Sequence, residues 1–388
     1  MKWRCETGPH GALYDTVHAR SVAAMHSAAP HDNARKPLVV AIDRSFLVSA
    51  AAVNLPHLTS HHHATPARDT AIKTLLSPVL LLSLSMVPSA PVAAQEKTVI
   101  SLATATPGGG FPVYGDAFAA VINATDPTLS VQTRNTKGSS ENIPLLENSQ
   151  VDIALVQGEA AHEAFAGIGR APANMKIIAA MYSSPGFFIV KKDSPYRSMA
   201  DLKGLPVAFG AAGSGLVILA RYVLDGVGLD QSQDFKAILL ERAGDGPAMV
   251  RDGRVAALWG GGAGWPGFTN LMKDGEARFI APSAEDITRI VAKHNFLKPL
   301  TLPANTYPHQ PEPMRSLGSW SFVVARTSLP DELAYRLMRA LHKGEAALAQ
   351  RLPAAAETTA ANTAAAAPRA DMLHPGVLRY LREAGLVK

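Results

Sequence analysis

Three short loops of this sequence are rich in glycine and hydroxyl side chains, the residue types that can hold a small anion. Residues 104–114 read Thr-Ala-Thr-Pro-Gly-Gly-Gly-Phe-Pro-Val-Tyr, residues 136–142 read Thr-Lys-Gly-Ser-Ser-Glu-Asn, and residues 210–215 read Gly-Ala-Ala-Gly-Ser-Gly. Glycine lets backbone N–H groups approach a ligand without a Cβ atom in the way. Where such a loop leads into a helix, the free N–H groups favour a carboxylate or a phosphate. The loops therefore predict an anion site, although a glycine run can also form a simple tight turn.

We expect most ligand contacts to come from the small and hydroxyl-bearing residues of these loops, because their N–H and O–H groups are the donors that an anion needs. The candidates are Thr106, Gly109, Gly110 and Tyr114 in the first loop, Gly138, Ser139 and Asn142 in the second, and Gly213, Ser214 and Gly215 in the third. Asn142 has an alternative role, since asparagine side chains commonly hydrogen-bond the backbone of their own loop.

Two further candidates are larger side chains at the ends of apolar runs. Gln157 follows the run 151–156, and ligand-binding residues gather where parallel strands end. Among the tryptophans, we choose Trp259 over Trp265 and Trp320 as the residue that lines the cleft. Each of the three could instead lie in the core, where an indole needs one partner for its N–H group.

The sequence offers no recognisable catalytic group, metal site or cofactor motif. It contains no G-x-S-x-G elbow, and the His tract at 61–63 has no carboxylate or cysteine at ligand spacing. The alternative is an exported enzyme or nucleotide-binding α/β protein that uses residues 210–215 after the apolar run 206–209. These glycines are ordered G-x-x-G-x-G instead of G-x-G-x-x-G. We therefore predict a binding protein that is not an enzyme, without metal or cofactor.

Alternating strand and helix patterns would place these loops at the edges of sheets. β-branched and apolar runs typical of strands lie at 98–103, 129–133, 151–156 and 177–182, and a second set lies at 205–209, 236–240 and 255–259. Repeated strand–loop–helix units predict mostly parallel sheets flanked by helices, with ligands beyond the carboxyl ends of the strands. A late apolar run at 320–325 could return the chain to the first set.

Composition and charge exclude other classes of protein. A length of 388 residues is enough for two lobes, and a hydrophobic content of 47% is ordinary for a globular protein. The formal net charge is +5, and residues 1–94 carry three of these charges. The remainder has no basic run and no stripe of basic and aromatic residues, so we expect no nucleic-acid partner.

Residues 69–94 have the pattern of a secretory signal. Lys73 precedes the apolar run 75–87, and Val-Ala-Ala at 92–94 forms a small-x-small cleavage site. The run is shorter than the roughly 20 residues of a membrane span, so we expect no stable membrane insertion after cleavage. We therefore predict a periplasmic protein that begins near Gln95. Residues 1–68 would be a disordered or wrongly assigned extension.

Several motifs occur in the order in which a known family has them. They are 107–110 (Pro-Gly-Gly-Gly), 136–142, 151–157 (Val-Asp-Ile-Ala-Leu-Val-Gln), 213–215 (Gly-Ser-Gly), 252–257 (Asp-Gly-Arg-Val-Ala-Ala), 304–308 (Ala-Asn-Thr-Tyr-Pro) and 374–376 (His-Pro-Gly). In this series the chain resembles the TAXI family of solute-binding receptors for TRAP transporters. The resemblance implies a receptor that delivers glutamate or a related carboxylate to the membrane subunits of a TRAP permease. The chain departs from the family at 111–114, where paired tyrosines are usual.

Together these observations predict an α/β fold of the two-lobed periplasmic binding protein type (type II-like). Each lobe would be a mostly parallel sheet flanked by helices, and two hinge crossovers would join the lobes. Lobe 1 would comprise residues 95–183 and lobe 2 residues 184–327, and residues 328–388 would pack mainly on lobe 1. We expect the loops at 107–110 and 213–215 to face each other across the cleft.

Overall fold

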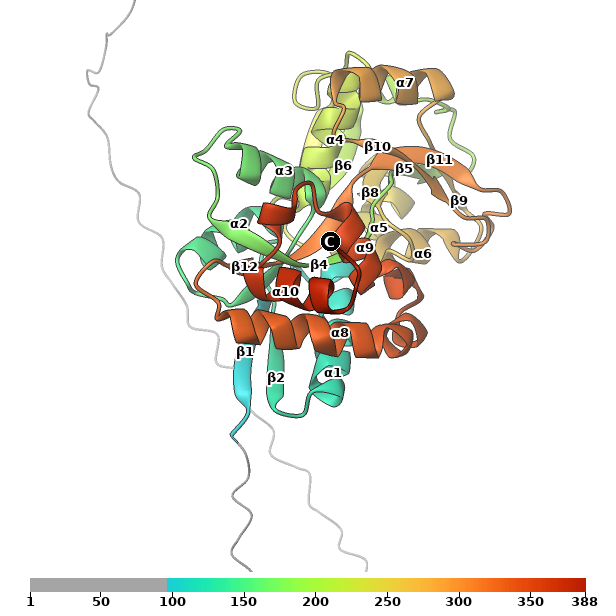
Figure 1. Cartoon of the computed structure of the whole chain (residues 1–388). Coiled ribbons are helices and arrows are strands. Elements are labelled where there is room, and N and C mark those ends of the chain that lie inside the picture. Colours follow the sequence, from blue (N-terminus) through green and yellow to red (C-terminus); the bar gives the residue numbers. More distant parts are fainter. Residues whose placement is uncertain (1–95) are drawn as a thin grey trace, which may run out of the picture. The chain divides into compact units, whose positions relative to one another are not determined.

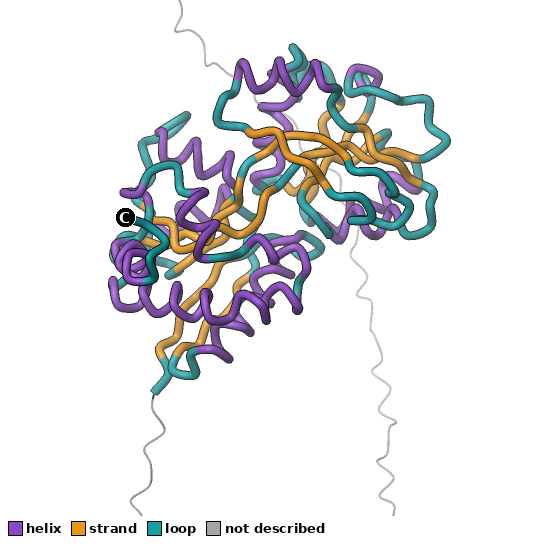
Figure 2. The backbone as a smooth tube through the Cα atoms, turned by 45° about the vertical axis from the view of Figure 1, so that its right-hand side comes forward, coloured by secondary structure: helices purple, strands orange, loops and turns teal. Residues whose placement is uncertain are grey.

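The apolar runs of the sequence form two five-stranded sheets in the computed structural model, which describes residues 96–388 (Figure 1). The tube in Figure 2 shows the strands gathered in two groups, each flanked by helices. The predicted signal at 69–94 and the predicted extension at 1–68 lie outside the described residues.

The sheet of lobe 1 has the strand order β2-β1-β3-β12-β4. Its strands are β1 (Thr98–Ala103), β2 (Leu129–Arg134), β3 (Ile153–Val156), β4 (Met175–Ser183) and β12 (Trp320–Arg326). The first three are parallel, whereas β12 runs antiparallel to both β3 and β4. The helices of this lobe are α1 (Gly110–Thr125), α2 (Ser139–Glu147), α3 (Gly158–Ala166), α8 (Asp331–Arg351), α9 (Ala360–Ala366) and α10 (Pro375–Glu383).

The sheet of lobe 2 has the order β7-β6-β8-β5-β9. Its strands are β5 (Gly186–Lys191), β6 (Pro206–Ala211), β7 (Lys236–Leu240), β8 (Ala257–Gly261) and β9 (Ala277–Ile280). Here β6 is parallel to β7 and β8, and β5 is antiparallel to β8 and β9. The lobe also contains α4 (Gly215–Gly226), α5 (Gly246–Arg251), α6 (Pro266–Met272), α7 (Ala284–Lys293) and an antiparallel ribbon of β10 (Lys298–Leu302) and β11 (Met314–Gly318).

The predicted two-lobed α/β fold is confirmed, and the two sheets share one plan. In each sheet a parallel triplet is followed by one antiparallel strand and then by an edge strand. The antiparallel strands, β5 and β12, are those that come directly after the chain has crossed from the other lobe. The sheets are therefore mixed, with one antiparallel strand each.

Two crossovers join the lobes, and the second lies earlier than the sequence indicated. The first runs through Ser184 and Pro185, between β4 and β5, and the second through Ser319, between β11 and β12. The two segments lie side by side, because the Ser184 N–H donates to the Ser319 carbonyl at 3.0 Å. The strand at 320–326 pairs in lobe 1, so the predicted boundary at residue 327 is wrong. Its buried valines, Val323 and Val324, fit between β3 and β4.

The C-terminal segment packs on lobe 1. Helix α8 lies against α1 and α10, and α9 lies against β4. Gly344 of α8 permits the close approach to α1, because a Cβ atom there would lie 2.5 Å from Val121 Cγ1. Among residues 96–388, no helix is both long and apolar enough to cross a membrane.

The order of elements places several helix N-termini at one edge of each sheet. Helices α1, α2 and α3 follow the parallel strands β1, β2 and β3, and α4 follows β6. Each of these helices therefore begins where a parallel strand ends, which is where α/β proteins bind ligands.

Candidate ligand-binding site

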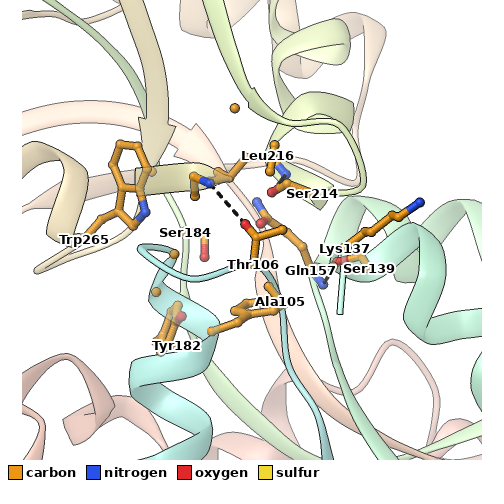
Figure 3. Close-up of a pocket in the computed structure, with 18 residues that line it drawn as sticks. Ala105, Thr106, Lys137, Ser139, Gln157, Tyr182, Ser184, Ser214, Leu216 and Trp265 are labelled. Atoms are coloured by element: carbon orange, nitrogen blue, oxygen red, sulfur yellow. Dashed lines mark hydrogen bonds between the residues drawn. The ribbon is translucent and has the colours of Figure 1, made fainter. Parts of the chain in front are cut away.

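The N-cap residues of four helices line one small cavity between the lobes (Figure 3). They are Gly109 of α1, Gly138 of α2 and Gln157 of α3 in lobe 1, and Ser214 of α4 in lobe 2. The N-cap residue of the seven-residue helix α6, Trp265, also lines the cavity. The cavity has a volume of about 50 Å³. The first-turn N–H groups of a helix have no partner within the helix. The sequence thus directs four positive helix ends at one space.

The first loop is shaped by glycine because it touches lobe 2. Gly108 has a φ of +82°, and a Cβ atom there would lie 2.5 Å from Gly244 Cα. The Gly244 N–H donates to the Pro107 carbonyl at 3.3 Å, and the Ala243 N–H donates to Thr106 Oγ1 at 3.1 Å. The loop at 107–110 therefore contacts 243–244, and its residues Gly109 and Gly110 line the same cavity as Ser214 of the loop at 213–215.

The second and third loops pack against each other across the same cavity. The Ser140 N–H donates to the Gly213 carbonyl at 3.1 Å. Gly138 has a φ of +112°, and a Cβ atom there would lie 2.9 Å from the Gly213 carbonyl oxygen. Gly213 is equally constrained, because its Cβ would lie 2.6 Å from the Lys137 carbonyl oxygen. These glycines are needed for the lobes to touch.

Asn142 holds the second loop in place and does not line the cavity. It is fully buried, and its Nδ2 donates to the carbonyls of Thr104 at 2.8 Å and Leu155 at 2.7 Å. Its Oδ1 accepts a hydrogen bond from Thr136 Oγ1 at 2.7 Å. All of its amide atoms are thus used to tie the loop to the ends of β1 and β3. We correct the prediction of ligand contact to the alternative structural role.

Ser139 and Gln157 present polar groups to the cavity from lobe 1. The Gln157 N–H donates to Ser139 Oγ at 3.1 Å, which leaves the serine hydroxyl hydrogen free to donate (Figure 3). Gln157 is 4% exposed, and its Nε2 has no hydrogen-bond partner among the described residues. A buried amide without a partner costs about 1–3 kcal/mol. The Gln157 side chain also interacts with the buried Glu159 carboxyl group, so a ligand would compete with Glu159 for this donor.

On the side of lobe 2, Ser214 and Trp265 border the cavity. Ser214 Oγ accepts the Leu216 N–H at 3.2 Å and keeps its own hydrogen for a ligand. The loop that carries Trp265 is fixed by Tyr307, whose hydroxyl accepts the Trp265 N–H at 2.8 Å and donates to the Gly262 carbonyl at 2.7 Å. Tyr307 is a positioning residue that sequence analysis missed.

The choice of Trp259 as the cleft tryptophan is wrong. Its ring is 1% exposed and packs against Phe188, with 4.7 Å between the ring centroids. Its Nε1 donates to the Leu216 carbonyl at 2.8 Å, so its one polar group is satisfied in the core of lobe 2. Trp265, six residues later, lines the cavity instead.

Three other predicted residues also lie outside the cavity lining. Tyr114 is fully buried, stacks on Phe118 and meets Tyr182 edge to face at 5.5 Å. Gly213 and Gly215 are covered by lobe 1, since a Cβ on Gly215 would lie 2.4 Å from Gln157 Cβ. Their physical role is to permit contact between the lobes.

The structure brings seven of the predicted residues together and adds others. The seven are Thr106, Gly109, Gly110, Gly138, Ser139, Gln157 and Ser214. The additions include Phe111, Tyr182, Ser184, Gly261 and Trp265. Four of these five, all except Phe111, lie at or just beyond the ends of β4 and β8. The rule that sites gather at strand ends points to these positions, but it does not choose the side chain.

The cavity is electrostatically suited to an anion. Within the described part of the chain, no aspartate or glutamate lines it, and Lys137 is its one charged side chain. Figure 3 shows the Lys137 side chain extending away from the other labelled residues. Burial raises the pKa of the Tyr182 hydroxyl, so this group remains a donor at physiological pH. Residues 96–388 hold no cluster of three or more His, Cys, Asp or Glu side chains that could bind a metal ion.

A buried carboxyl group lies close behind the site. Glu159 follows Gln157 by two residues, and its Oε1 accepts a hydrogen bond from Ser319 Oγ of the second crossover at 2.7 Å. Its Oε2 has no partner among the described residues. Burial raises the pKa of Glu159 to about 7. This carboxyl group therefore titrates near neutral pH, next to a hinge segment.

The family profile described as the NMT1-like family matches residues 102–385. Among solved structures, a protein of Bordetella bronchiseptica RB50 is similar, with 16% identity, a TM-score of 0.48, and coverage of 74% of this chain and 98% of that one. The periplasmic binding protein BugD is similar at 14% identity and a TM-score of 0.48, with 74% and 98% coverage. The alkanesulfonate-binding protein SsuA of Xanthomonas axonopodis pv. citri, with MOPS bound, has 18% identity, a TM-score of 0.44, and 74% and 85% coverage. All three are distant similarities of fold.

Proposed function

This chain belongs to the NMT1-like family, and we propose that it is an extracytoplasmic receptor that binds a small carboxylate between its lobes. The observation that carries the proposal is the convergence of the α1, α2, α3 and α4 N-caps on one cavity without a carboxylate in its lining. Positive helix ends and free N–H groups attract an anion, and the lining holds no negative side chain that would repel it.

Binding would rest on hydrogen bonds rather than on an ion pair. The donors are first-turn N–H groups, the hydroxyls of Ser139 and Ser214, and Nε2 of Gln157. Hydrogen bonds to a charged partner contribute about 1.5–3 kcal/mol each. A carboxylate held by several of them gains enough to offset its desolvation without any arginine or lysine at its side.

The two crossovers would act as the hinge that opens the cavity for entry and release of the solute. Cross-lobe hydrogen bonds to Thr106 and Gly213 hold the lobes in contact around the cavity. Two-lobed receptors admit ligands by hinge motion at such crossovers, and a ligand that contacts both lobes favours the arrangement in which they touch.

We further propose the periplasm as the site of action and a TRAP-type permease as the partner. The signal pattern at 69–94 supports export, and the resemblance to the TAXI family supports delivery of glutamate or a related carboxylate to TRAP membrane subunits.

Binding of a dinucleotide by the loop at 210–215 fits poorly. Gly213 packs on the backbone of Lys137, and the cavity has a volume of about 50 Å³. The loop that would have to cradle a pyrophosphate is therefore covered by lobe 1, and its glycines serve the contact between the lobes.

Calorimetry on the exported protein, stripped of ligand by unfolding and refolding, tests the proposal. The panel comprises glutamate, short monocarboxylates and dicarboxylates, an alkanesulfonate and NAD. We expect one carboxylate to bind with a stoichiometry of one and a Kd in the micromolar range or below. Binding of NAD alone, or of the sulfonate alone, would contradict the proposed solute class.

A further inference from the structure

A second cavity, of about 600 Å³, lies beside the second crossover and shares no lining residue with the cavity of the N-caps. We call it the hinge pocket. Lobe 1 lines it with parts of α3, β12 and α9, and lobe 2 lines it with Phe296 and Lys298. Ser319 of the crossover completes the wall. Its volume is within the range of about 300–1,000 Å³ that is usual for sites of small organic molecules.

The walls of the hinge pocket are largely apolar and aromatic. His162 of lobe 1 stacks on Phe296 of lobe 2, with 3.9 Å between the ring centroids and 7° between the planes. Burial lowers the pKa of His162, so its ring packs as an uncharged group at neutral pH. Phe165, Trp320 and Phe322 add further aromatic surface. Such walls match the flat or chain-like body of an organic ligand.

The charged side chains that line the hinge pocket are all positive. Lys298 and Arg369 line it, and no carboxylate among the described residues does. Arg369 is already paired with Asp371 through hydrogen bonds of 2.9 and 3.0 Å. Lys298 donates only to the Asn295 carbonyl, at 3.0 Å, and forms no ion pair with a described residue. Its positive charge is therefore available at the edge of an apolar space.

We propose that the hinge pocket is a second ligand site, for a small amphipathic anion. The aryl or short alkyl body of the ligand packs against the aromatic walls, and its carboxylate or sulfonate meets the Lys298 ammonium group. The inference does not depend on which solute binds at the N-caps, because the two cavities have no residue in common.

A titration of the exported protein with 1-anilinonaphthalene-8-sulfonate tests this site, followed by octanoate as a competitor. Ala365 is exposed on α9 and lines the pocket, so Ala365→Trp fills it. Ala361 is exposed on the same helix but does not line the pocket, so Ala361→Trp is the matched control. We expect one saturable dye site that octanoate displaces. Dye affinity should fall at least tenfold in Ala365→Trp and stay unchanged in Ala361→Trp.

The charge is tested by Lys298→Gln, which should weaken the dye three- to tenfold. Lys236→Gln, on exposed β7 of the same lobe, should have no effect. Equal dye affinity in the two tryptophan variants would overturn the proposal. Loss of the dye in Ser214→Ala, with retention in Ala365→Trp, would also overturn it, because the dye would then bind at the N-caps. Failure of octanoate to compete would refute the carboxylate part of the proposed ligand class.

Discussion

Gln157 is the residue whose surroundings are explained best by a ligand. Its amide is nearly inaccessible to solvent, lines the cavity, and leaves Nε2 without a hydrogen-bond partner among the described residues. A purely structural glutamine at such a position would be expected to satisfy both amide groups. The Gln157 side chain also interacts with the buried Glu159 carboxyl group, so we propose that Glu159 and the ligand compete for this donor.

Gln157→Leu should separate the effects on binding and on stability. The change removes a donor for the ligand and a buried polar group without a partner, so affinity should fall tenfold to a hundredfold. The free energy of unfolding should stay the same or rise by about 1 kcal/mol. Calorimetry and urea unfolding measure the two quantities, and Gln150→Leu on the surface is the control. A variant that binds normally but unfolds more easily would show that Gln157 is only structural.

Glu159 gives the protein a defined pH dependence. Burial raises the pKa of Glu159 from 4.5 to about 7, so the folded state favours the neutral acid. The stability that this group contributes below pH 4.5 is lost as the pH rises to 7, because the charged form is then penalised by burial. Glu159→Gln should remove this loss, which amounts to about 3 kcal/mol at most.

Urea unfolding at pH 5 and pH 8 measures the effect of Glu159→Gln. We expect the variant to be more stable than the wild type at pH 8 and similar to it at pH 5. Glu276→Gln, at an exposed position, should follow the wild type at both values. A variant that is destabilised equally at both pH values would mean that the carboxylate form of Glu159 is needed.

Which side chains of a loop face the ligand could be predicted only in part. Glycine and serine at 109, 110, 138, 139 and 214 were found because loops that lead into a helix N-terminus lie at the carboxyl edge of the sheet, where ligands bind. Trp259 and Trp265 could not be distinguished, because the sequence does not show which face of β8 packs into the core, nor how the loop after β8, which carries Trp265, folds back. The Asn142 amide could hydrogen-bond either a ligand or the nearby backbone. Only the folded positions of the Thr104 and Leu155 carbonyls show that it bonds the backbone.

At the scale of elements, the proposed site depends on the N-termini of α1, α2, α3 and α4. Among their four N-cap residues, only Ser214 caps its helix with its side chain. Ser214 Oγ accepts the Leu216 N–H, as Ser283 Oγ accepts the Asp286 N–H at the start of α7. Ser214→Ala and Ser283→Ala should each lower the free energy of unfolding by about 1 kcal/mol. Only Ser214→Ala should weaken the solute, by about tenfold.

Thermal unfolding and calorimetry on this matched pair separate the loss of a cap from the loss of a ligand contact. If both variants bind the solute equally well, the α4 N-terminus is not part of the site. If both variants bind it equally poorly, the effect arises from global destabilisation.

The strands that the sequence identified are those with unbroken apolar runs. The runs at 98–103 and 129–133 correspond closely to β1 and β2, because each strand buries its apolar side chains in the core of lobe 1. The ribbon of β10 and β11 was missed, because β10 is mostly exposed and neither strand has a clear alternation of buried and exposed residues. The membership of β12 in lobe 1 depends on pairing with β3 and β4 across more than 130 residues, which no local pattern reveals.

At the scale of the whole described chain, the lobes touch through glycine. Gly108 meets Gly244, and Gly138 meets Gly213, at distances that leave no room for a Cβ atom. The cavity is therefore enclosed by backbone as much as by side chains. On the proposed function, backbone N–H groups would let a sequence with few charged residues in its loops bind an anion.

The central claim is that a small carboxylate binds at the four N-caps, and a crystal structure of the exported protein with its tightest-binding carboxylate tests it most directly. We predict carboxylate oxygens within hydrogen-bond distance of Gln157 Nε2, the Ser139 hydroxyl and the Ser214 hydroxyl. A carboxylate that binds with full affinity in solution but lies elsewhere in the crystal, with these three groups free of it, would contradict the account.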